Sequence, residues 1–144
     1  LDNSTTAMTG HQPHPGTGRT VMGEIVQKIN IEQVLRGIGV TEIETINPLE
    51  LEASVSCVKR MAEKSGVRAI IFKAPCIAVT KPKAPLHVDQ DSCIGCKKCI
   101  RDLGCPAIVM NDGKICIDAS MCTGCHLCSQ VCPVCAIAGG DDHE

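Results

Sequence analysis

The chain has 144 residues, a net charge of −2 and a single aromatic side chain, Phe72. This charge balance excludes the basic patches that are typical of nucleic-acid binding or of attachment to an anionic membrane surface. The chain has no run of 18 apolar residues and no signal-peptide pattern, so we expect a soluble, cytoplasmic protein without a membrane partner. Twelve cysteines are the extreme feature, and without an export signal they favour metal binding over disulfides.

The chain opens with LDN, which has the pattern of a strand end, and Leu1 is not an initiator methionine. We therefore expect a C-terminal piece of a longer polypeptide. The next residues, STTAMTGHQPHPGTG, form a polar, glycine-rich loop suited to a charged, oxygen-rich ligand. Asn3 offers a side-chain carbonyl and Thr5 a backbone carbonyl, the hard donors that Mg²⁺ accepts beside phosphate oxygens. Composition alone fits an ordinary surface loop equally well.

A first helix and a first strand are predicted in residues 30–46. Four apolar residues recur there at helical spacing: Ile31, Val34, Leu35 and Ile38. Asn30 is the expected N-cap, Gln33 stands at the capping-box position, and Gly39 is the expected stop. The stretch EIETI, residues 42–46, then alternates like a short strand.

A second helix and a second strand are predicted to follow. Asn47-Pro48 is expected to start the helix, with the proline in its first turn, and the helix is expected to end near Gly66. Its predicted apolar face consists of Leu51, Val55, Val58 and Ala62. The run VRAIIF, residues 67–72, suits a buried parallel strand. This alternation predicts an α/β fold whose parallel sheet carries its ligand site at the carboxyl ends of the strands.

Residues 80–87, TKPKAPLH, are rich in proline and lysine, and we assign a linker to residues 81–86. An internal repeat with an offset of 29 residues follows, in a small α+β domain expected over residues 87–138. The repeat matches Cys93, Cys96 and Cys99 with Cys122, Cys125 and Cys128, and Gly95 with Gly124; each half closes with Cys-Pro. Residues 139–144 are expected to be a solvated tail.

The cysteine spacing predicts iron–sulfur clusters. Structural zinc sites usually use two separated pairs of ligands, often with histidine. The second half of the repeat instead has the bacterial ferredoxin spacing C-x₂-C-x₂-C-x₃-C-P, in which the fourth cysteine ligates the other cluster. We therefore assign one [4Fe–4S] cluster to Cys93, Cys96, Cys99 and Cys132. The other is assigned to Cys122, Cys125, Cys128 and Cys105.

The first half departs from this spacing, with five residues instead of three between Cys99 and Cys105. We expect a longer turn or helix there, with unchanged ligation. Gly95 and Gly124 suit positions where the backbone passes close to a cluster. The other four cysteines are expected to be small buried apolar side chains: Cys57, Cys76, Cys116 and Cys135.

Two clusters in one small domain make a short path for single electrons, so the bond chemistry must happen elsewhere. A cluster with four thiolates adds roughly two negative charges when oxidised. Lys97, Lys98 and Arg101 are placed to offset that charge or to guide a partner. An ordinary solvated surface explains these three residues equally well.

The opening stretch DNSTTAMTGHQPHPG resembles the thiamine diphosphate loop of the 2-oxoacid:ferredoxin oxidoreductases, in particular the alpha subunit of the indolepyruvate-using members. The resemblance covers essentially the whole chain, including NPLELE and APC, and it implies the C-terminal part of a thiamine diphosphate-binding domain over residues 1–80. It further implies that Asn3 binds Mg²⁺ through its side chain and Thr5 through its backbone oxygen. Gly10 and Gln12 would line the cofactor. Met8 stands where pyruvate-using relatives carry asparagine, which fits a bulky aryl substrate.

The same resemblance implies the activity of the complete subunit. Aryl 2-oxoacids are oxidatively decarboxylated with thiamine diphosphate, coenzyme A collects the acyl group, and two clusters pass electrons to an external ferredoxin. A beta subunit of the same oxidoreductase is the implied partner. The Gly-Asp half of the Mg²⁺ motif and the pyrimidine-binding domain are missing from this sequence, so this chain alone is expected to be inactive.

Two other hypotheses stay open from the sequence. One is a non-catalytic, two-cluster ferredoxin-type electron carrier with an unrelated α/β extension, although a carrier has no use for a Mg²⁺–diphosphate loop. The other is an oxidoreductase of the same family that acts on pyruvate or branched-chain 2-oxoacids. Turnover of indolepyruvate against pyruvate separates this last hypothesis from the first.

Overall fold

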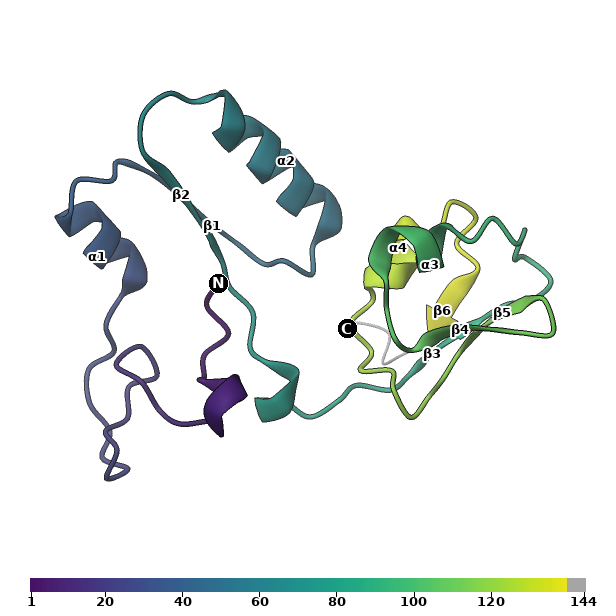
Figure 1. The fold of residues 1–144 in the computed structure, drawn as a ribbon, viewed down its shortest axis with the longest axis horizontal. Helices are drawn as coiled ribbons and strands as arrows, with labels where there is room; N and C mark the ends of the chain where they lie inside the picture. Colours follow the sequence, from purple (N-terminus) through teal and green to yellow (C-terminus); the bar gives the residue numbers. More distant parts are fainter. Residues whose placement is uncertain (140–144) are drawn as a thin grey trace. The chain divides into compact units, whose positions relative to one another are not determined.

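A computed structural model describes residues 1–139 and divides the chain into two compact units (Figure 1). The first unit is Leu1–Lys81, and the second begins at Pro82, inside the predicted linker. Each unit has strands of its own, which pair within that unit. None of the helices within residues 1–139 has the length and apolarity needed to cross a membrane.

In the first unit, helix α1 has the boundaries that the sequence predicts. The loop before it contains a single 3₁₀ turn, η1 (Ala7–Thr9), and α1 spans Ile31–Gly37. The side chain of Asn30 caps the helix, since its Oδ1 accepts a hydrogen bond from the backbone N–H of Gln33 at 3.2 Å. Gly39 has a φ of 95° and its N–H donates to the carbonyl of Arg36 at 3.0 Å, which ends the helix. The predicted cap and stop are confirmed.

Strand β1 (Glu42–Ile46) and strand β2 (Arg68–Phe72) form a parallel pair, as predicted. The opening residues lie beside the end of β2, where a parallel bridge joins Asp2 to Lys73. The N–H of Asp2 donates to the carbonyl of Phe72 at 2.8 Å, and the N–H of Ala74 donates to the carbonyl of Asp2 at 3.1 Å. The residues LDN are thus paired like the end of a parallel strand.

Helix α2 (Leu51–Glu63) begins later than predicted. Asn47-Pro48 forms a turn before it, in which Asn47 Oδ1 accepts a hydrogen bond from the N–H of Leu49 at 3.0 Å. The predicted apolar face is wrong, since Val55 is 44% exposed and Val58 is 46% exposed. Cys57 and Met61 are buried instead.

The buried face of α2 is selected by polar contacts with β1. Glu44 accepts hydrogen bonds from Arg60 and, at 3.4 Å, from the thiol of Cys57. Lys64 Nζ lies 2.6 Å from Glu42 Oε2. These contacts hold the side of the helix that carries Cys57 against β1, which turns Val55 and Val58 toward solvent.

The second unit contains two antiparallel strand pairs and two short helices (Figure 1). Strand β3 (Leu86–Val88) pairs with β6 (Ile137–Gly139), and β4 (Ile108–Asn111) pairs with β5 (Lys114–Ile117). Asp112 and Gly113, both with positive φ, form the two-residue hairpin turn between β4 and β5. Helices α3 (Lys98–Leu103) and α4 (Leu127–Val131) each contain the third cysteine of a run, Cys99 and Cys128.

Two predicted boundaries of the second unit need correction. Leu86, assigned to the linker, belongs to β3, and Gly139, assigned to the tail, belongs to β6. These two residues are register partners across the antiparallel pair. Local sequence patterns missed this pairing because the partners are far apart in the chain. The rest of the predicted tail, residues 140–144, lies outside the described residues.

Candidate metal centre

The two cysteine runs share one backbone conformation. The glycines that match in the repeat, Gly95 and Gly124, have φ values of 65° and 66°. The residues before the two helices, Lys97 and His126, both have a φ of 60°. Non-glycine residues rarely adopt left-handed backbone, so its occurrence at matching positions shows that the repeat extends from sequence to structure.

An aspartate turn precedes each run. The main-chain carbonyls of Asp89 and Asp118 accept hydrogen bonds from the N–H groups of Cys93 and Cys122, both at 3.0 Å. Each aspartate also accepts a hydrogen bond from the hydroxyl of a following serine. That bond is the main reason why the pKa of each aspartate lies below its ordinary value. The turns therefore fix where each run begins.

The two halves are crossed at the level of the backbone. The N–H of Asp89 donates to the carbonyl of Ala136, and the N–H of Asp118 donates to the carbonyl of Ala107, both at 2.8 Å. Each alanine follows the Cys-Pro pair of the half that does not contain its aspartate, and both alanines are buried. The segments after Cys105 and Cys132 are held in place by these bonds.

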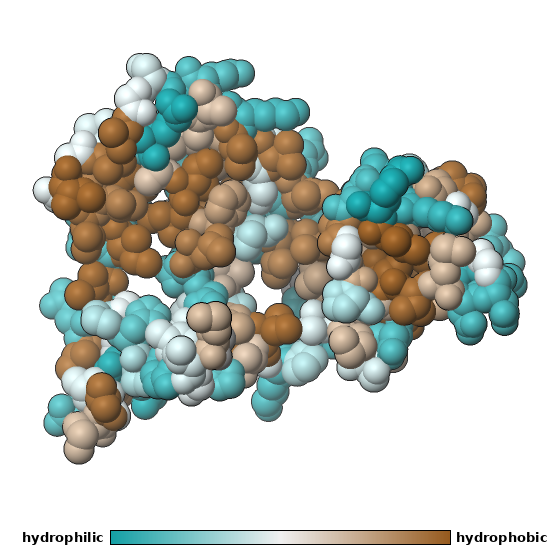
Figure 2. Space-filling view, viewed as in Figure 1, coloured by the Kyte–Doolittle hydropathy of each residue, from teal (hydrophilic) through white to brown (hydrophobic). Residues whose placement is uncertain are grey.

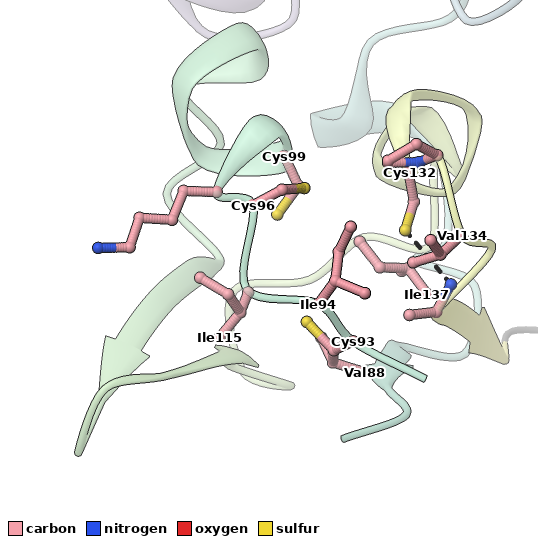
Figure 3. A pocket seen from close by; sticks show the side chains of 12 residues that line it. Val88, Cys93, Ile94, Cys96, Cys99, Ile115, Cys132, Val134 and Ile137 are labelled. Atoms are coloured by element: carbon pink, nitrogen blue, oxygen red, sulfur yellow. Dashed lines mark hydrogen bonds between the residues drawn. The ribbon is translucent and has the colours of Figure 1, made fainter. Parts of the chain in front are cut away.

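Four of the predicted ligands line a single cavity (Figure 3). They are Cys93, Cys96, Cys99 and Cys132, three from the first run and one from the second. Figure 3 shows the side chain of Ile94 among them. The N–H of Ala136 donates to Cys132 Sγ at 3.3 Å. Burial raises the pKa of the Cys99 thiol, and the nearby thiols of Cys132 and Cys96 raise it further.

The other predicted ligands act on the thiol of Cys128. Burial is the main cause that raises the pKa of this thiol to about 11. The neighbouring thiols of Cys125, Cys122 and Cys105 raise it further, so Cys105 of the first run lies near the cysteines of the second. The structure therefore brings the cysteines together in the two crossed groups, and their roles as ligands stay a prediction.

These two donor sets fit iron–sulfur clusters. Such clusters are held by cysteine thiolates and tuned by hydrogen bonds to sulfur, and the bond from Ala136 to Cys132 is of this kind. All twelve cysteines are free of disulfides. Across residues 1–139, no group of three or more His, Cys, Asp or Glu side chains is arranged to hold a single metal ion.

The longer spacing of the first run produces a longer helix, as expected. Helix α3 has six residues and α4 has five. Gly104 ends α3 in a left-handed conformation, with a φ of 58°, and its N–H donates to the carbonyl of Ile100 at 3.1 Å. The glycine absorbs the extra length and returns the chain to Cys105.

The remaining cysteines differ in exposure. Cys57 is fully buried, Cys76 and Cys116 are half-buried, and Cys135 is exposed. The expectation of four buried side chains is therefore met only by Cys57. Cys135 has a φ of 53° and donates its N–H to the carbonyl of Cys132 at 3.3 Å. This left-handed turn after Pro133 directs the Cys135 side chain outward.

The N-terminal loop holds all five residues that were predicted to bind the thiamine cofactor or Mg²⁺. Asn3 Oδ1 accepts a hydrogen bond from the N–H of Thr5 at 3.3 Å, and the Asn3 carbonyl accepts one from the N–H of Cys76 at 2.9 Å. Thr5 is 8% exposed, whereas Met8 is almost fully exposed. Asn3 thus ties the loop to the segment after β2.

Gln12 has a role inside the loop that the sequence did not indicate. Its side-chain oxygen accepts hydrogen bonds from the hydroxyls of Thr6 and Thr9, both at 2.8 Å, and its carbonyl accepts one from the N–H of Thr6 at 3.4 Å. Gly10, with a φ of 106°, makes the intervening turn possible. The available sequence signal for these bonds was the presence of Thr6 and Thr9 shortly before Gln12.

A cavity of about 460 Å³ lies at the carboxyl ends of β1 and β2, where parallel sheets place their ligands. Its polar lining includes Asp2, Ser4, Lys28, Asn30 and Lys73. None of the five residues predicted to bind the thiamine cofactor lines it. The structure therefore has a cavity where the sequence predicted a ligand site in this unit, but the residues that line it are not the predicted ones.

Comparison with known proteins supports both units. A family model described as a 4Fe-4S dicluster domain matches residues 85–133, which establishes that domain in the second unit. Indolepyruvate oxidoreductase subunit IorA of Methanothermobacter thermautotrophicus is 44% identical over 139 residues, covering 95% of this chain and 22% of the relative. Subunits of the same name from Archaeoglobus fulgidus and Thermococcus kodakarensis are 38% and 40% identical, covering 95% and 92% of this chain and 23% and 22% of the relatives.

This chain thus spans less than a quarter of the length of these relatives. The match nevertheless includes the N-terminal loop and the α/β unit as well as the cysteine repeat, since it covers more than nine-tenths of the chain. The resemblance predicted from the sequence is confirmed, and this chain is a relative of indolepyruvate oxidoreductase subunit IorA along nearly its whole length.

Proposed function

We propose that this chain is the part of an indolepyruvate:ferredoxin oxidoreductase alpha subunit that conducts electrons away from the thiamine diphosphate centre. The observation that carries the proposal is the meeting of Cys93, Cys96 and Cys99 with Cys132 around one cavity (Figure 3). Four thiols drawn from two sequence motifs are the donor set of a [4Fe–4S] cluster. The cysteines around Cys128 would hold a second cluster.

The residues of this chain have separate roles in that function. When bound, the two clusters accept and release one electron each. The cysteines would hold them, and the N–H of Ala136 would stabilise the negative charge on Cys132 Sγ. The buried side chains around the cavity, such as Ile137, keep water away from the thiolates.

The N-terminal loop would supply one wall of the thiamine diphosphate site. Asn3 and Thr5 provide oxygen donors of the kind that Mg²⁺ accepts, and a carbonyl oxygen can accept both an N–H and a cation. The bond from Thr5 to Asn3 holds the two donors next to each other. Gln12 would keep the loop closed through Thr6 and Thr9 while Gly10 lets its backbone approach the cofactor.

The enzyme hypothesis is favoured over a free electron carrier by the extent of the resemblance. The family model of the 4Fe-4S dicluster domain covers residues 85–133, whereas the IorA relatives match 92–95% of the chain. An unrelated extension would not share this identity over the first unit. The names of the relatives also favour indolepyruvate as substrate, and the exposed Met8 would face a bulky aryl group.

The test uses the complete alpha subunit that contains this segment, together with its beta subunit. We expect coenzyme A-dependent oxidation of indolepyruvate to exceed that of pyruvate at equal concentrations, and about eight iron atoms per alpha chain from two four-iron clusters. A preference for pyruvate would reject the proposed substrate. Iron content without any 2-oxoacid oxidation would favour the carrier hypothesis instead.

A further inference from the structure

The two cysteine loops have the same backbone but different surroundings within the second unit. The N–H of Lys83 donates to the carbonyl of Thr123 at 3.2 Å, so residues just after the unit boundary lie against the second loop. A Cβ atom at Gly124 would lie 2.7 Å from the carbonyl oxygen of Ala84. A Cβ atom at Gly95 would meet no atom within 4 Å. The second loop is therefore covered, and the first loop is open.

The side chains of the first cysteine loop are also more exposed than those of the second. Ile94 is 66% exposed, and Cys96 is an exposed member of its cysteine group. Its counterpart Cys125 is half-buried, and Gly124 is buried. Because Cys96 lines the cavity of the first group and also reaches the surface, this group has the more accessible edge.

The open loop is cationic and the covered loop is not. The segment CKKCIRDL, residues 96–103, contains Lys97, Lys98 and Arg101, all exposed, against one acid, Asp102. Asp102 Oδ1 lies 3.7 Å from Arg101 Nε. The matching segment CHLCSQV, residues 125–131, has no lysine, arginine or acid. Figure 2 shows hydrophilic side chains gathered over α3. Of these two matching segments, only the one that leaves its cysteines accessible carries lysine and arginine.

We propose that this surface, the cationic loop formed by Ile94, Lys97, Lys98 and Arg101 around Cys96, is where an acidic one-electron acceptor protein docks. The inference rests on the proposed function. One electron leaves the cluster held by the first cysteine group, which is oxidised by one electron, and enters the redox centre of the acceptor, which is reduced by one electron. No bond forms or breaks in this step.

Charge complementarity is the physical reason for choosing an acidic partner. The loaded cysteine groups add negative charge to a chain whose net charge is already −2, so an acidic acceptor would be repelled by most of the surface. Three neighbouring cations make the electrostatic potential positive at the accessible edge of the first cysteine group. Such complementarity steers encounter and fixes orientation, and it weakens as salt increases.

The test uses the complete oxidoreductase and an oxidised acidic ferredoxin as the probe. The paired substitution Lys97→Glu with Lys98→Glu should weaken binding at low salt by about tenfold or more. The difference should vanish at about 1 M salt, where the screening length falls to roughly 3 Å. Lys83→Glu makes the same kind of charge change beside the covered loop and should leave the dissociation constant within about twofold of the unchanged protein.

Two further measurements separate docking from other roles of the lysines. Indolepyruvate-dependent reduction of methyl viologen, a small cationic acceptor, should be retained in the paired variant. Unchanged ferredoxin binding, or equal weakening by Lys83→Glu, would overturn the proposal. A shifted cluster potential with normal binding would also overturn it, because the lysines would then serve the cluster and not a partner.

The proposed function and the docking surface can fail separately. If the unchanged oxidoreductase reduces no methyl viologen with indolepyruvate, the proposed function fails whatever the binding result. If it reduces methyl viologen but ferredoxin binding ignores the cationic loop, only the docking surface fails. Arg101→Gln provides a milder variant should the paired substitution lower the iron content, and it should weaken low-salt binding by about twofold to fivefold.

Discussion

The strand pair of the first unit and the cysteine runs of the second unit are ordered by contacts of different range. In the first unit, β1 pairs with a strand more than twenty residues away, and Lys64, just after α2, reaches Glu42 on β1. In the second unit, the course of each cysteine run is set by an aspartate turn and a left-handed residue within a few positions. Short-range contacts can be read from a motif, whereas distant pairings depend on the assembled sheet.

The two units also differ in how much apolar surface they leave exposed. In the first unit, Val34 on α1 and Val55 and Val58 on α2 are each more than 40% exposed, and Figure 2 shows apolar surface over this unit. The second unit buries both alanines of its crossed turns and the first residues of β4 and β6, Ile108 and Ile137. The second unit thus leaves fewer large apolar side chains exposed than the α/β unit does.

The largest expected effect tests whether the repeat is crossed. Cys132→Ala removes the only second-run thiol from the first cavity, so we expect loss of the cluster held by Cys93, Cys96 and Cys99 and of about half of the iron. Electron paramagnetic resonance of the reduced protein would check this. Cys135→Ala, which changes an exposed cysteine outside both groups, should keep both signals. Loss of only the cluster around Cys128 would contradict the crossed grouping.

The next effect tests the long-range packing of the first unit. Met61 is 1% exposed, so Met61→Ala should lower the free energy of opening this unit by about 2–5 kcal/mol through lost burial and a new cavity. Val58→Ala, on the exposed face of the same helix, should cost less than about 1 kcal/mol. Hydrogen exchange of the β1 and β2 amides reports this opening separately from the second unit. Equal effects would mean that α2 packs through both faces.

A glycine pair tests the different cover of the two cysteine loops. Gly95→Ala and Gly124→Ala introduce the same left-handed strain, because the two φ values are 65° and 66°. Only the second also drives a Cβ against the carbonyl of Ala84. We expect Gly124→Ala to cost about 1–3 kcal/mol more than Gly95→Ala in denaturant unfolding of the loaded protein. Equal costs would show that the segment at residues 83–84 does not hold the second loop.

The smallest effect concerns the acidic turns and their pH dependence. The hydroxyl of Ser120 holds the pKa of Asp118 below its ordinary value of 3.8. A lowered pKa gives stability that is complete above pH 3.8 and is lost as the pH falls through the lower folded value. Asp118→Asn removes the charge, so cluster bleaching should be faster than in the unchanged protein at neutral pH, by less than about tenfold. The two rates should converge in acid; a constant ratio would contradict the assignment.

Particular residues show what the sequence could predict. The cap at Asn30, the stop at Gly39 and the two strands of the parallel pair follow from local chemistry and are observed. The face of α2 was mispredicted because Val55 and Val58 recur at the same helical period as Cys57 and Met61. Periodicity identifies an amphipathic helix but does not say which side is buried when both are apolar.

In the candidate site, too, some features were predictable from the sequence and others were not. The grouping of the cysteines was expected from a spacing rule; the four of the first group line one cavity, and the ligand roles of both groups stay a prediction. The left-handed conformation of Lys97 carried no sequence signal, since lysine is not among the residue types that favour positive φ. Gln12 was assigned to the cofactor by resemblance, and its bonds to Thr6 and Thr9 were visible only once the loop was folded.

The pairing of β3 with β6 has a consequence for how the second unit is made. Synthesis proceeds from the N-terminus, and all eight motif cysteines, the last of them Cys132, are complete before Ile137–Gly139 of β6 leaves the ribosome. Strand β3 has β6 as its partner, so this edge of the nascent unit stays unpaired until then. All eight predicted ligands therefore precede the strand that completes the pairing of β3.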